Sequence, residues 1–253
     1  MNMMNSDVML RDIAHRPYPL PSGPWIMTQS WHELLFAHWP FAPETLRPLI
    51  PSVLSLDTFE GQAWVGVVPF RMTNVHPRGS PSVPGLSQFV ELNVRTYVIV
   101  NGIPGVYFFS LDASSRIAVF LARQIFHLPY FHAAMQCNNI KGAIHYRSHR
   151  FHHPPSAADF VGSYRPTGPV FHSQRDSLEY WLTERYCLYA VMKGNKVYRA
   201  NIHHPQWPLQ PAELKTVNNT VALADGVHLP DVAPLLHYAR RQDVLVWPLR
   251  RVG

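Results

Sequence analysis

Proline recurs along the whole chain, from Pro17 to Pro248, and this limits how long any helix can be. The 24 prolines in 253 residues are close to twice the usual share of about 5%. A proline inside a helix removes a backbone hydrogen bond and clashes with the preceding turn. The sequence therefore excludes a coiled coil.

The clearest strand pattern covers Phe89–Val100, where polar and apolar residues alternate. Glu91, Asn93 and Arg95 fall on one face, and the other face is apolar apart from one threonine. A glycine-containing loop at residues 101–105 leads into a second strand-like segment, Val106–Asp112. A period of two is typical of a strand whose faces meet different environments. The two segments are therefore predicted to form a β-hairpin.

Other segments add strands and a few short helices. Runs rich in β-branched and aromatic residues predict further strands; they cover Gln62–Met72, Ala143–Phe151, Tyr186–Met192, Lys196–His203 and Asp243–Trp247. Capping residues and prolines predict helices over Pro43–Ile50, Ser115–Phe126 and Asp176–Glu184, with a weaker candidate over Pro211–Ala224. We therefore expect an α+β fold that is mostly antiparallel β. Residues 1–16 are expected to be a tail, and residues 17–252 a single domain.

Charge and composition limit the classes of partner that the protein is expected to bind. The net charge is +6, but the arginines are scattered and form no recognition motif, so we expect no nucleic-acid partner. No apolar run approaches about 18 residues, so we expect no membrane partner. The two cysteines, Cys137 and Cys187, are expected to be free thiols. The first 16 residues lack the apolar stretch of a secretory signal, which favours a cytoplasmic location.

The polar face of Phe89–Val100 is the first candidate site. If paired residues of the hairpin sum to about 205 in number, Ser110 lies opposite Arg95 and Asp112 opposite Asn93, so that both join this face. A one-residue change of register would place Phe109 and Leu111 there instead. Two interpretations stay open at this point, a solvated outer face and a polar lining inside the fold.

A second candidate lies at Leu182–Tyr186, where a short predicted helix meets a strand. Glu184, Arg185 and Tyr186 there could line a pocket or cap the local backbone.

A metal site is not expected. His145 and His149 share a face of a predicted strand, but Arg147 lies between them, and His152 and His153 follow without a recognised ligand spacing. We also expect no cofactor.

Several stretches of the chain together resemble the YqjF-like proteins, a bacterial family of unknown function. They are LLFAHWP (residues 34–40), LRPLIP (46–51), ELNVRTY (91–97), GVYFFSLD (105–112), LTERY (182–186) and HHPQWPL (203–209). The resemblance implies a fold similar to acetoacetate decarboxylase, a closed β-barrel or double sheet with small helices and an internal pocket. It supplies no established activity.

The decarboxylase relatives use a buried lysine that forms a Schiff base with a keto acid. The lysines of this chain, Lys141, Lys193, Lys196 and Lys215, lie in predicted turns or in a helical stretch. Schiff-base decarboxylation is therefore not expected, and whether the protein is an enzyme is left open.

The favoured hypothesis is a fold with an internal polar pocket that binds a small anionic or oxygenated organic molecule, with lysine-independent acid/base chemistry as a further step. Glu91 and Glu184 are the candidate catalytic residues. The candidate ligand-binding residues are Asn93, Arg95, Asp112, Arg185, Tyr186 and His204. The alternative is a ligand-binding or structural protein without catalysis. A homo-oligomer is compatible with both.

Overall fold

The computed structural model describes residues 3–83, 87–151 and 158–253. In this part of the chain thirteen strands form one sheet. They are β1 (Met27–Phe41), β2 (Ser55–Leu56), β3 (Ala63–Pro77), β4 (Phe89–Val100), β5 (Ile103–Ala113), β6 (Tyr130–Ile140), β7 (Ala143–Arg150), β8 (Asp159–Pro166), β9 (Cys187–Met192), β10 (Lys196–His203), β11 (Leu209–Asn219), β12 (Leu235–Val246) and β13 (Arg250–Arg251). The helices are α1 (Ser6–Arg11), α2 (Pro43–Leu46), the 3₁₀ helix η1 (Arg47–Leu49), α3 (Arg116–Ile125), α4 (Leu178–Thr183) and α5 (Val221–Ala224). This confirms the predicted α+β, mostly antiparallel fold.

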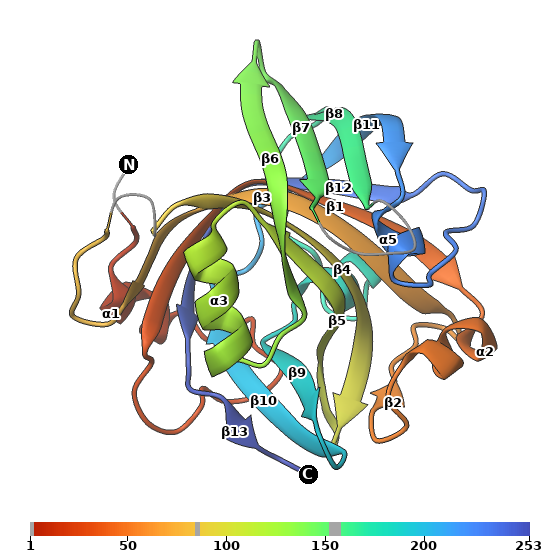
Figure 1. The fold of residues 1–253 in the computed structure, drawn as a ribbon. Helices are drawn as coiled ribbons and strands as arrows, with labels where there is room; N and C mark the ends of the chain where they lie inside the picture. Colours follow the sequence, from red (N-terminus) through yellow and green to blue (C-terminus); the bar gives the residue numbers. More distant parts are fainter. Residues whose placement is uncertain (1–2, 84–86, 152–157) are drawn as a thin grey trace.

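The sheet closes on itself. Its strand order is β13-β10-β9-β5-β6-β7-β8-β11-β12-β1-β3-β4-β2, and two additional pairings, β10–β12 and β4–β5, join strands that are distant in this order. Strands β1, β3, β4, β5, β9, β10 and β12 thereby form a ring. The pairs β5–β6 and β5–β9 are parallel, and the other strand pairs of the described residues are antiparallel. In Figure 1 the β6–β7 hairpin projects from one side, and α3 lies in front of the curved sheet.

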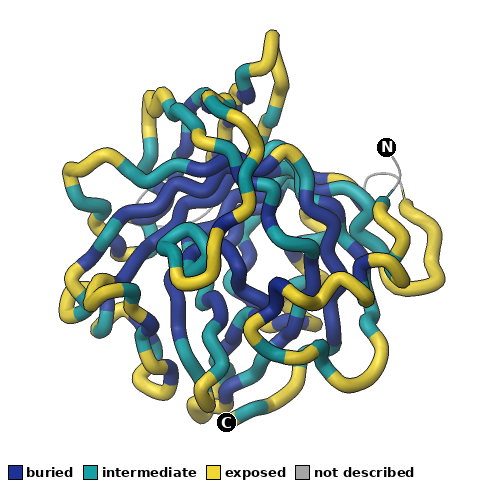
Figure 2. Tube along the Cα trace, turned by 180° about the vertical axis from the view of Figure 1, so that it is seen from behind, coloured by how far each residue is buried: buried dark blue, intermediate teal, exposed yellow. Residues whose placement is uncertain are grey.

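The alternation of β4 separates two apolar cores. Leu92 and Val94 pack on the outer side of the ring, against residues such as Tyr146 and Phe160 of β7 and β8. On the inner side, residues such as Phe70 of β3 pack with residues of β1, β5, β12 and α3. Figure 2 shows the result: buried segments run through the strands, and exposed ones gather at the turns. The strands of the ring are therefore buried on both faces.

The β4–β5 hairpin forms as predicted, but with a different register. Asn93 pairs with Leu111 and Leu92 with Asp112, and a shift between Val94 and Arg95 places Arg95 opposite Phe108. The shift inserts one extra residue into β5, which is a β-bulge. The predicted pairing of Arg95 with Ser110 and of Asn93 with Asp112 is wrong. Ser110 and Asp112 therefore lie on the outer side of the ring, away from Glu91, Asn93 and Arg95.

Helix α3 forms where the sequence predicts it, with the Ser115 hydroxyl accepting a hydrogen bond from the Ala118 amide at 3.3 Å. Val119 and Phe126 face the core, whereas Ile117, Leu121 and Ile125 are exposed. The 3–4 spacing of apolar residues therefore does not identify the buried side of this helix, because apolar residues occupy most of its surface, including the exposed side.

The weak helix prediction over Pro211–Ala224 is wrong for most of its length. Residues Leu209–Asn219 form β11, and only Val221–Ala224 are helical. Helix-forming residues such as Glu213 and Leu214 are held in an extended conformation because β11 pairs with β8. Helix propensity is weak enough for such tertiary pairing to override it.

The N-terminal segment packs against the ring. Met9 of α1 is buried with Leu245 and Trp247, and the Met9 carbonyl oxygen lies 2.7 Å from His203 Nε2. This contact brings the first residues beside the β10–β11 connection, which carries His204 and Trp207.

Candidate functional site

A cavity of about 290 Å³ lies inside the ring. Most of its wall is apolar, with side chains from β1, β3, β4, β5 and α3 such as Phe70, Phe108 and Ile125. Its polar lining residues include Glu91, Asn93, Arg95, Thr183, Arg185 and His204. The polar face of β4 therefore lines this cavity, and five of the eight candidate site residues meet there.

Glu91 is a buried carboxyl that forms no ion pair with an arginine of the described residues. It is 2% exposed, and the Tyr130 hydroxyl donates a hydrogen bond to its Oε2 at 2.8 Å. Burial raises the pKa of Glu91 to about 8, although hydrogen bonds from Tyr130 and Asn93 act in the opposite direction. At neutral pH the side chain is therefore mostly a neutral acid that can donate a proton.

Arg95 contacts aromatic rings. Its guanidinium lies 5.1 Å from the centre of the Phe36 ring and 5.9 Å from that of Tyr97. None of the ion pairs found among the described residues includes Arg95. The Tyr97 hydroxyl lies 2.6 Å from His38 Nε2, and the charge of Arg95 partly offsets the rise that burial causes in the pKa of Tyr97. The half-buried guanidinium of Arg95 is thus held in place by the rings of Phe36 and Tyr97 and by the Tyr97 hydroxyl.

Arg185 approaches the same tyrosine. Its guanidinium lies 4.8 Å from the centre of the Tyr97 ring and forms an ion pair with Asp57 Oδ2 at 2.6 Å. It also donates to the Trp181 carbonyl at 2.6 Å. Arg95 and Arg185 therefore share Tyr97 as a neighbour at one end of the cavity, where Asp57 offsets the charge of Arg185.

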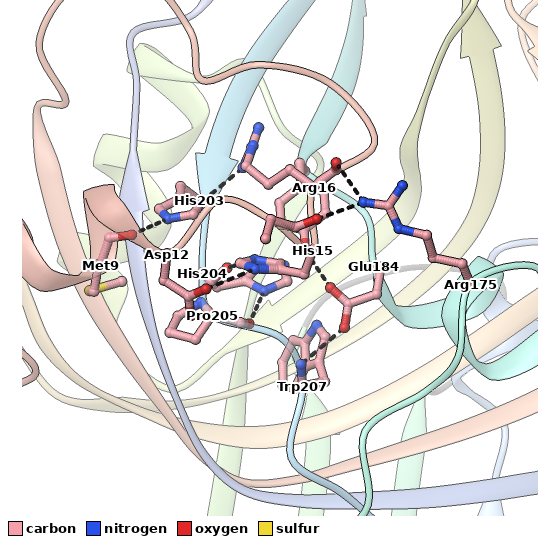
Figure 3. Close-up of polar contacts among 12 residues, drawn as sticks. Met9, Asp12, His15, Arg16, Arg175, Glu184, His203, His204, Pro205 and Trp207 are labelled. Carbon is pink, nitrogen blue, oxygen red and sulfur yellow. Dashed lines mark hydrogen bonds and ion pairs between the residues drawn. The ribbon is translucent and has the colours of Figure 1, made fainter.

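Glu184 and Tyr186 support this end without lining the cavity. Glu184 accepts a hydrogen bond from the Trp207 amide at 2.9 Å and a second from the Tyr186 hydroxyl, and burial raises its pKa to about 7. The Tyr186 ring stacks on His204, with ring centres 4.6 Å apart. In Figure 3 Glu184 points toward Trp207, while His15 and Arg16 of the N-terminal segment lie on the opposite side. Both candidates therefore position the lining residues Trp207 and His204.

His204 lines the cavity as a neutral imidazole. Burial lowers its pKa to about 3. Its Nδ1 lies 2.8 Å from the Pro205 carbonyl oxygen, and its Nε2 lies 3.4 Å from that of Arg185. The ring adds no charge to the two arginines at neutral pH.

Asp112 belongs to a different cluster. The Arg150 guanidinium donates to Asp112 Oδ1 at 2.7 Å, to Ser110 Oγ at 2.8 Å and to Asp225 Oδ1 at 3.3 Å. Burial raises the pKa of Asp112 to about 6, against the effect of Arg150. Since this cluster lies on the outer side of the ring, Asp112 does not line the cavity with the other candidates.

A family model matches residues 28–243; it is named DUF2071 and described as an uncharacterized conserved protein. The chain belongs to this family. It is 52% identical over 232 residues to the uncharacterized protein YqjF of Bacillus subtilis (strain 168), an alignment that covers 92% of this chain and 95% of that protein. The predicted membership of the YqjF-like family is confirmed.

Solved structures show the fold of this DUF2071 member. Acetoacetate decarboxylase from Legionella pneumophila subsp. pneumophila str. Philadelphia 1 aligns with a TM-score of 0.60 and 13% identity over 97% of this chain and 95% of that one. The enduracididine biosynthesis enzyme MppR with HEPES buffer bound aligns with a TM-score of 0.62 and 9% identity over 94% and 91%. The predicted resemblance to the acetoacetate decarboxylase fold is confirmed, and at these identities it concerns the fold alone.

Several lining residues of this family member have no signal in the sequence that predicts a site. Tyr130 follows a proline and reaches Glu91 only because β6 runs parallel to β5. Trp207 lies in the HHPQWPL stretch that carries the family resemblance, but nothing in that stretch shows that Trp207 faces Phe36, 4.9 Å away between ring centres.

The remaining candidates for chemistry lie outside the cavity. All four lysines are exposed, and none lines the cavity. The described residues contain no group of three or more histidine, cysteine or acidic side chains placed to hold a metal ion. His149 pairs with Asp159 at 2.6 Å, and His152 and His153 lie outside the described residues. In the described parts of the chain no helix has the length and apolar character needed to cross a membrane.

Proposed function

We propose that the cavity binds a small organic carboxylate with an apolar body, and that Glu91 takes up a proton from solvent when this ligand binds. One observation carries the proposal: Arg95 and Arg185 both approach the Tyr97 ring at one end of a mostly apolar cavity, and only Arg185 is paired with a carboxylate of the described residues. Ligand sites of this kind combine an apolar wall with a few placed polar groups.

Buried polar atoms in the same region support the proposal. Arg95 Nε, Arg185 Nη2, Trp207 Nε1 and Asn93 Oδ1 have no hydrogen-bond partner among the described residues. A buried polar atom left without a partner destabilises a fold by roughly 1–3 kcal/mol. A ligand that accepts from the arginines and from Trp207 would satisfy the three N–H donors of this set, and a planar carboxylate fits the fork of a guanidinium.

The position of Glu91 supports its proposed role. Glu91 and Arg95 lie on one face of β4, four residues apart, so their Cα atoms are separated by about 13 Å. A ligand whose carboxylate meets Arg95 would extend its apolar body past Asn93 toward Glu91. Glu184 also has a raised pKa. However, its carboxyl already accepts hydrogen bonds from the Trp207 amide and the Tyr186 hydroxyl, and it does not line the cavity.

Binding is tested by calorimetry with matched ligands. Apolar carboxylates of graded size are compared with their uncharged amides, using wild type, Arg95→Lys and the control Arg165→Lys. Arg165 is exposed on β8 and paired with Glu213. We expect carboxylates alone to bind wild type and the control, and a loss of tenfold or more in affinity for Arg95→Lys, which keeps the charge but loses the fork. Equal affinity for amides and carboxylates would contradict the proposal.

The role of Glu91 is tested by the proton balance of binding. The apolar body of the ligand would remove water from around Glu91 and raise the pKa of this residue further, so wild type should take up protons when it binds the ligand near pH 8. Glu91→Gln should bind without this uptake. The uptake appears as a dependence of the binding enthalpy on the ionisation enthalpy of the buffer. If wild type shows no such dependence, the cavity is a binding site in which Glu91 does not change its protonation, which is the second candidate function.

A further inference from the structure

We propose that the outer face of α3 docks on a lipid surface that contains anionic lipids. The proposal rests on two features, an exposed apolar surface on this helix and the distribution of charge around it. It does not depend on the ligand proposed for the cavity.

The exposed side of α3 is apolar. Phe120 is 62% exposed, Ile117 58%, Ile125 51% and Leu121 39%, while Val119 and Phe126 face the core. At 100° per residue the four exposed side chains lie together on the outward side of the helix. Clustered exposed apolar side chains of this kind mark interaction sites in soluble proteins.

The exposed charge in the stretch of chain that carries α3 is of one sign. Residues 61–158 contain two acidic residues, Glu91 and Asp112, and both are buried. The basic residues of the same stretch are Arg71, Arg78, Arg95, Arg116, Arg123, Lys141, Arg147 and Arg150. Arg116 and Arg123 are exposed on α3 itself, so the apolar side chains stand beside positive charge with no exposed carboxylate in that stretch.

A negatively charged apolar surface complements this arrangement, and an anionic bilayer has both properties. A second copy of the chain fits poorly, because a two-fold contact through α3 would bring four arginines, Arg116 and Arg123 of both copies, into one interface. A peptide usually needs a groove, whereas these side chains are exposed on a helix that lies in front of the sheet (Figure 1).

The docking face continues into the cavity. Leu121 and Ile125 are exposed and also line the cavity wall. The end of β3, at Val75 and Pro77, lines the same cavity, and the exposed Arg78 follows directly. The apolar end of the cavity would therefore open toward the lipid surface, while the Arg95 and Arg185 end lies deeper in the ring.

This inference revises the expectation of no membrane partner, which was drawn from the absence of a long apolar run. That argument concerns membrane-spanning helices, whereas a surface helix needs only one apolar face and basic neighbours. Each arginine near an anionic surface contributes roughly 1 kcal/mol to docking, or about fivefold in affinity.

The experiment is flotation of the full chain with vesicles of phosphatidylcholine alone or of phosphatidylcholine mixed with phosphatidylglycerol. We expect binding to the mixed vesicles only, and a loss of binding between about 0.1 M and about 1 M salt as the screening length falls from roughly 10 Å to 3 Å. Phe120→Ser and Ile125→Ser should each weaken binding roughly tenfold, and Arg116→Gln and Arg123→Gln roughly fivefold each.

Matched controls separate docking from general effects of charge and exposed apolar area. Val217→Ser removes an 82% exposed apolar side chain from β11, and Arg165→Gln lowers the net charge as much as Arg116→Gln does; both should bind vesicles as wild type does. No binding to the mixed vesicles, or binding that the α3 variants leave unchanged, would overturn the proposal. A concentration-dependent dimer that Phe120→Ser abolishes, without vesicle binding, would also overturn it and assign the face to a second copy.

Discussion

Two arginines lie near the β4–β5 hairpin in contrasting surroundings. Arg150, on the outer side of the ring, donates to Asp112, Ser110 and Asp225. Arg95, on the inner side, lies against the rings of Phe36 and Tyr97 and has no carboxylate partner among the described residues. On one side of the hairpin, Arg150 is paired with carboxylates of the protein. On the other side, Arg95 faces the cavity.

The contrast indicates different roles for the two residues. A buried charge is tolerated when its pairing offsets the loss of solvation. Arg150 meets this condition within the fold, so its cluster has a structural explanation. Arg95 is only half-buried and is surrounded by aromatic rings, so its charge remains available to an anion that enters the cavity.

The largest expected effect follows from removing Arg150. Arg150→Met leaves Asp112 buried beside Asp225 without its cation, and breaking a buried pair in this way destabilises a protein by about 3–5 kcal/mol. Urea unfolding monitored by tryptophan fluorescence measures this effect. The variant Arg165→Met removes an exposed member of a pair and should change stability by no more than about 1 kcal/mol. If Arg150→Met and Arg165→Met both changed stability by such a small amount, Arg150 would not be a structural cation, and its contrast with Arg95 would disappear.

A smaller effect is expected from the pH dependence of stability. The pKa of Glu91 is about 8 in the folded protein, above its unfolded value. Its contribution to stability is therefore complete below the unfolded pKa and is lost as pH rises toward 8. Between pH 7 and pH 8 this loss is roughly 1 kcal/mol, since one pKa unit corresponds to about 1.4 kcal/mol.

The matched variant is Glu91→Gln, which should flatten the decline between pH 7 and pH 8. Glu184, with a pKa of about 7, also contributes below this window, and Glu184→Gln should therefore alter the curve mainly below pH 7. Urea midpoints measured at closely spaced pH values separate the two. An unchanged slope in Glu91→Gln would show that Glu91 is ionised in the folded protein at neutral pH.

The sequence predicts one wall of the site well because β4 obeys a simple rule. Its alternation assigns Glu91, Asn93 and Arg95 to one face, and the structure places all three on the cavity. The same rule fails one strand later, because the bulge in β5 near Phe109 changes which residues share that face. Phe108 and Phe109 are both aromatic, so the sequence does not reveal which of them is the extra residue.

The rest of the site depends on contacts between distant segments. Arg185 pairs with Asp57, which is 128 residues away in the chain, and Trp207 meets Phe36 through the closure of the ring. No local pattern encodes either contact. The LTERY stretch predicts a polar junction between a helix and a strand. Only the three-dimensional structure shows that Arg185 lines the cavity whereas Glu184 lies behind its wall.

Replacing Arg95 should have little effect on stability. Arg95→Met removes a half-buried cation without leaving a buried carboxylate unpaired, so the free energy of unfolding should change by less than about 1 kcal/mol. The same variant should lose the carboxylate binding that we propose. Denaturant unfolding beside Arg150→Met tests this directly. A loss similar to that of Arg150→Met would show that Arg95 is part of the structural framework and would weaken its assignment to a ligand.

The smallest expected effect is the complete absence of a covalent adduct with a keto acid. A lysine that forms a Schiff base is activated by burial or by a neighbouring cation, and the four lysines of this chain are exposed and lie away from the cavity. Incubation with a keto acid and borohydride, followed by peptide mass spectrometry, should therefore modify no lysine stoichiometrically. The variant in which Lys141, Lys193, Lys196 and Lys215 are all replaced by arginine sets the background. A stoichiometric adduct on one lysine of wild type would mean that chemistry occurs away from the Arg95 cavity, and the comparison between the two arginines would then no longer locate the functional site.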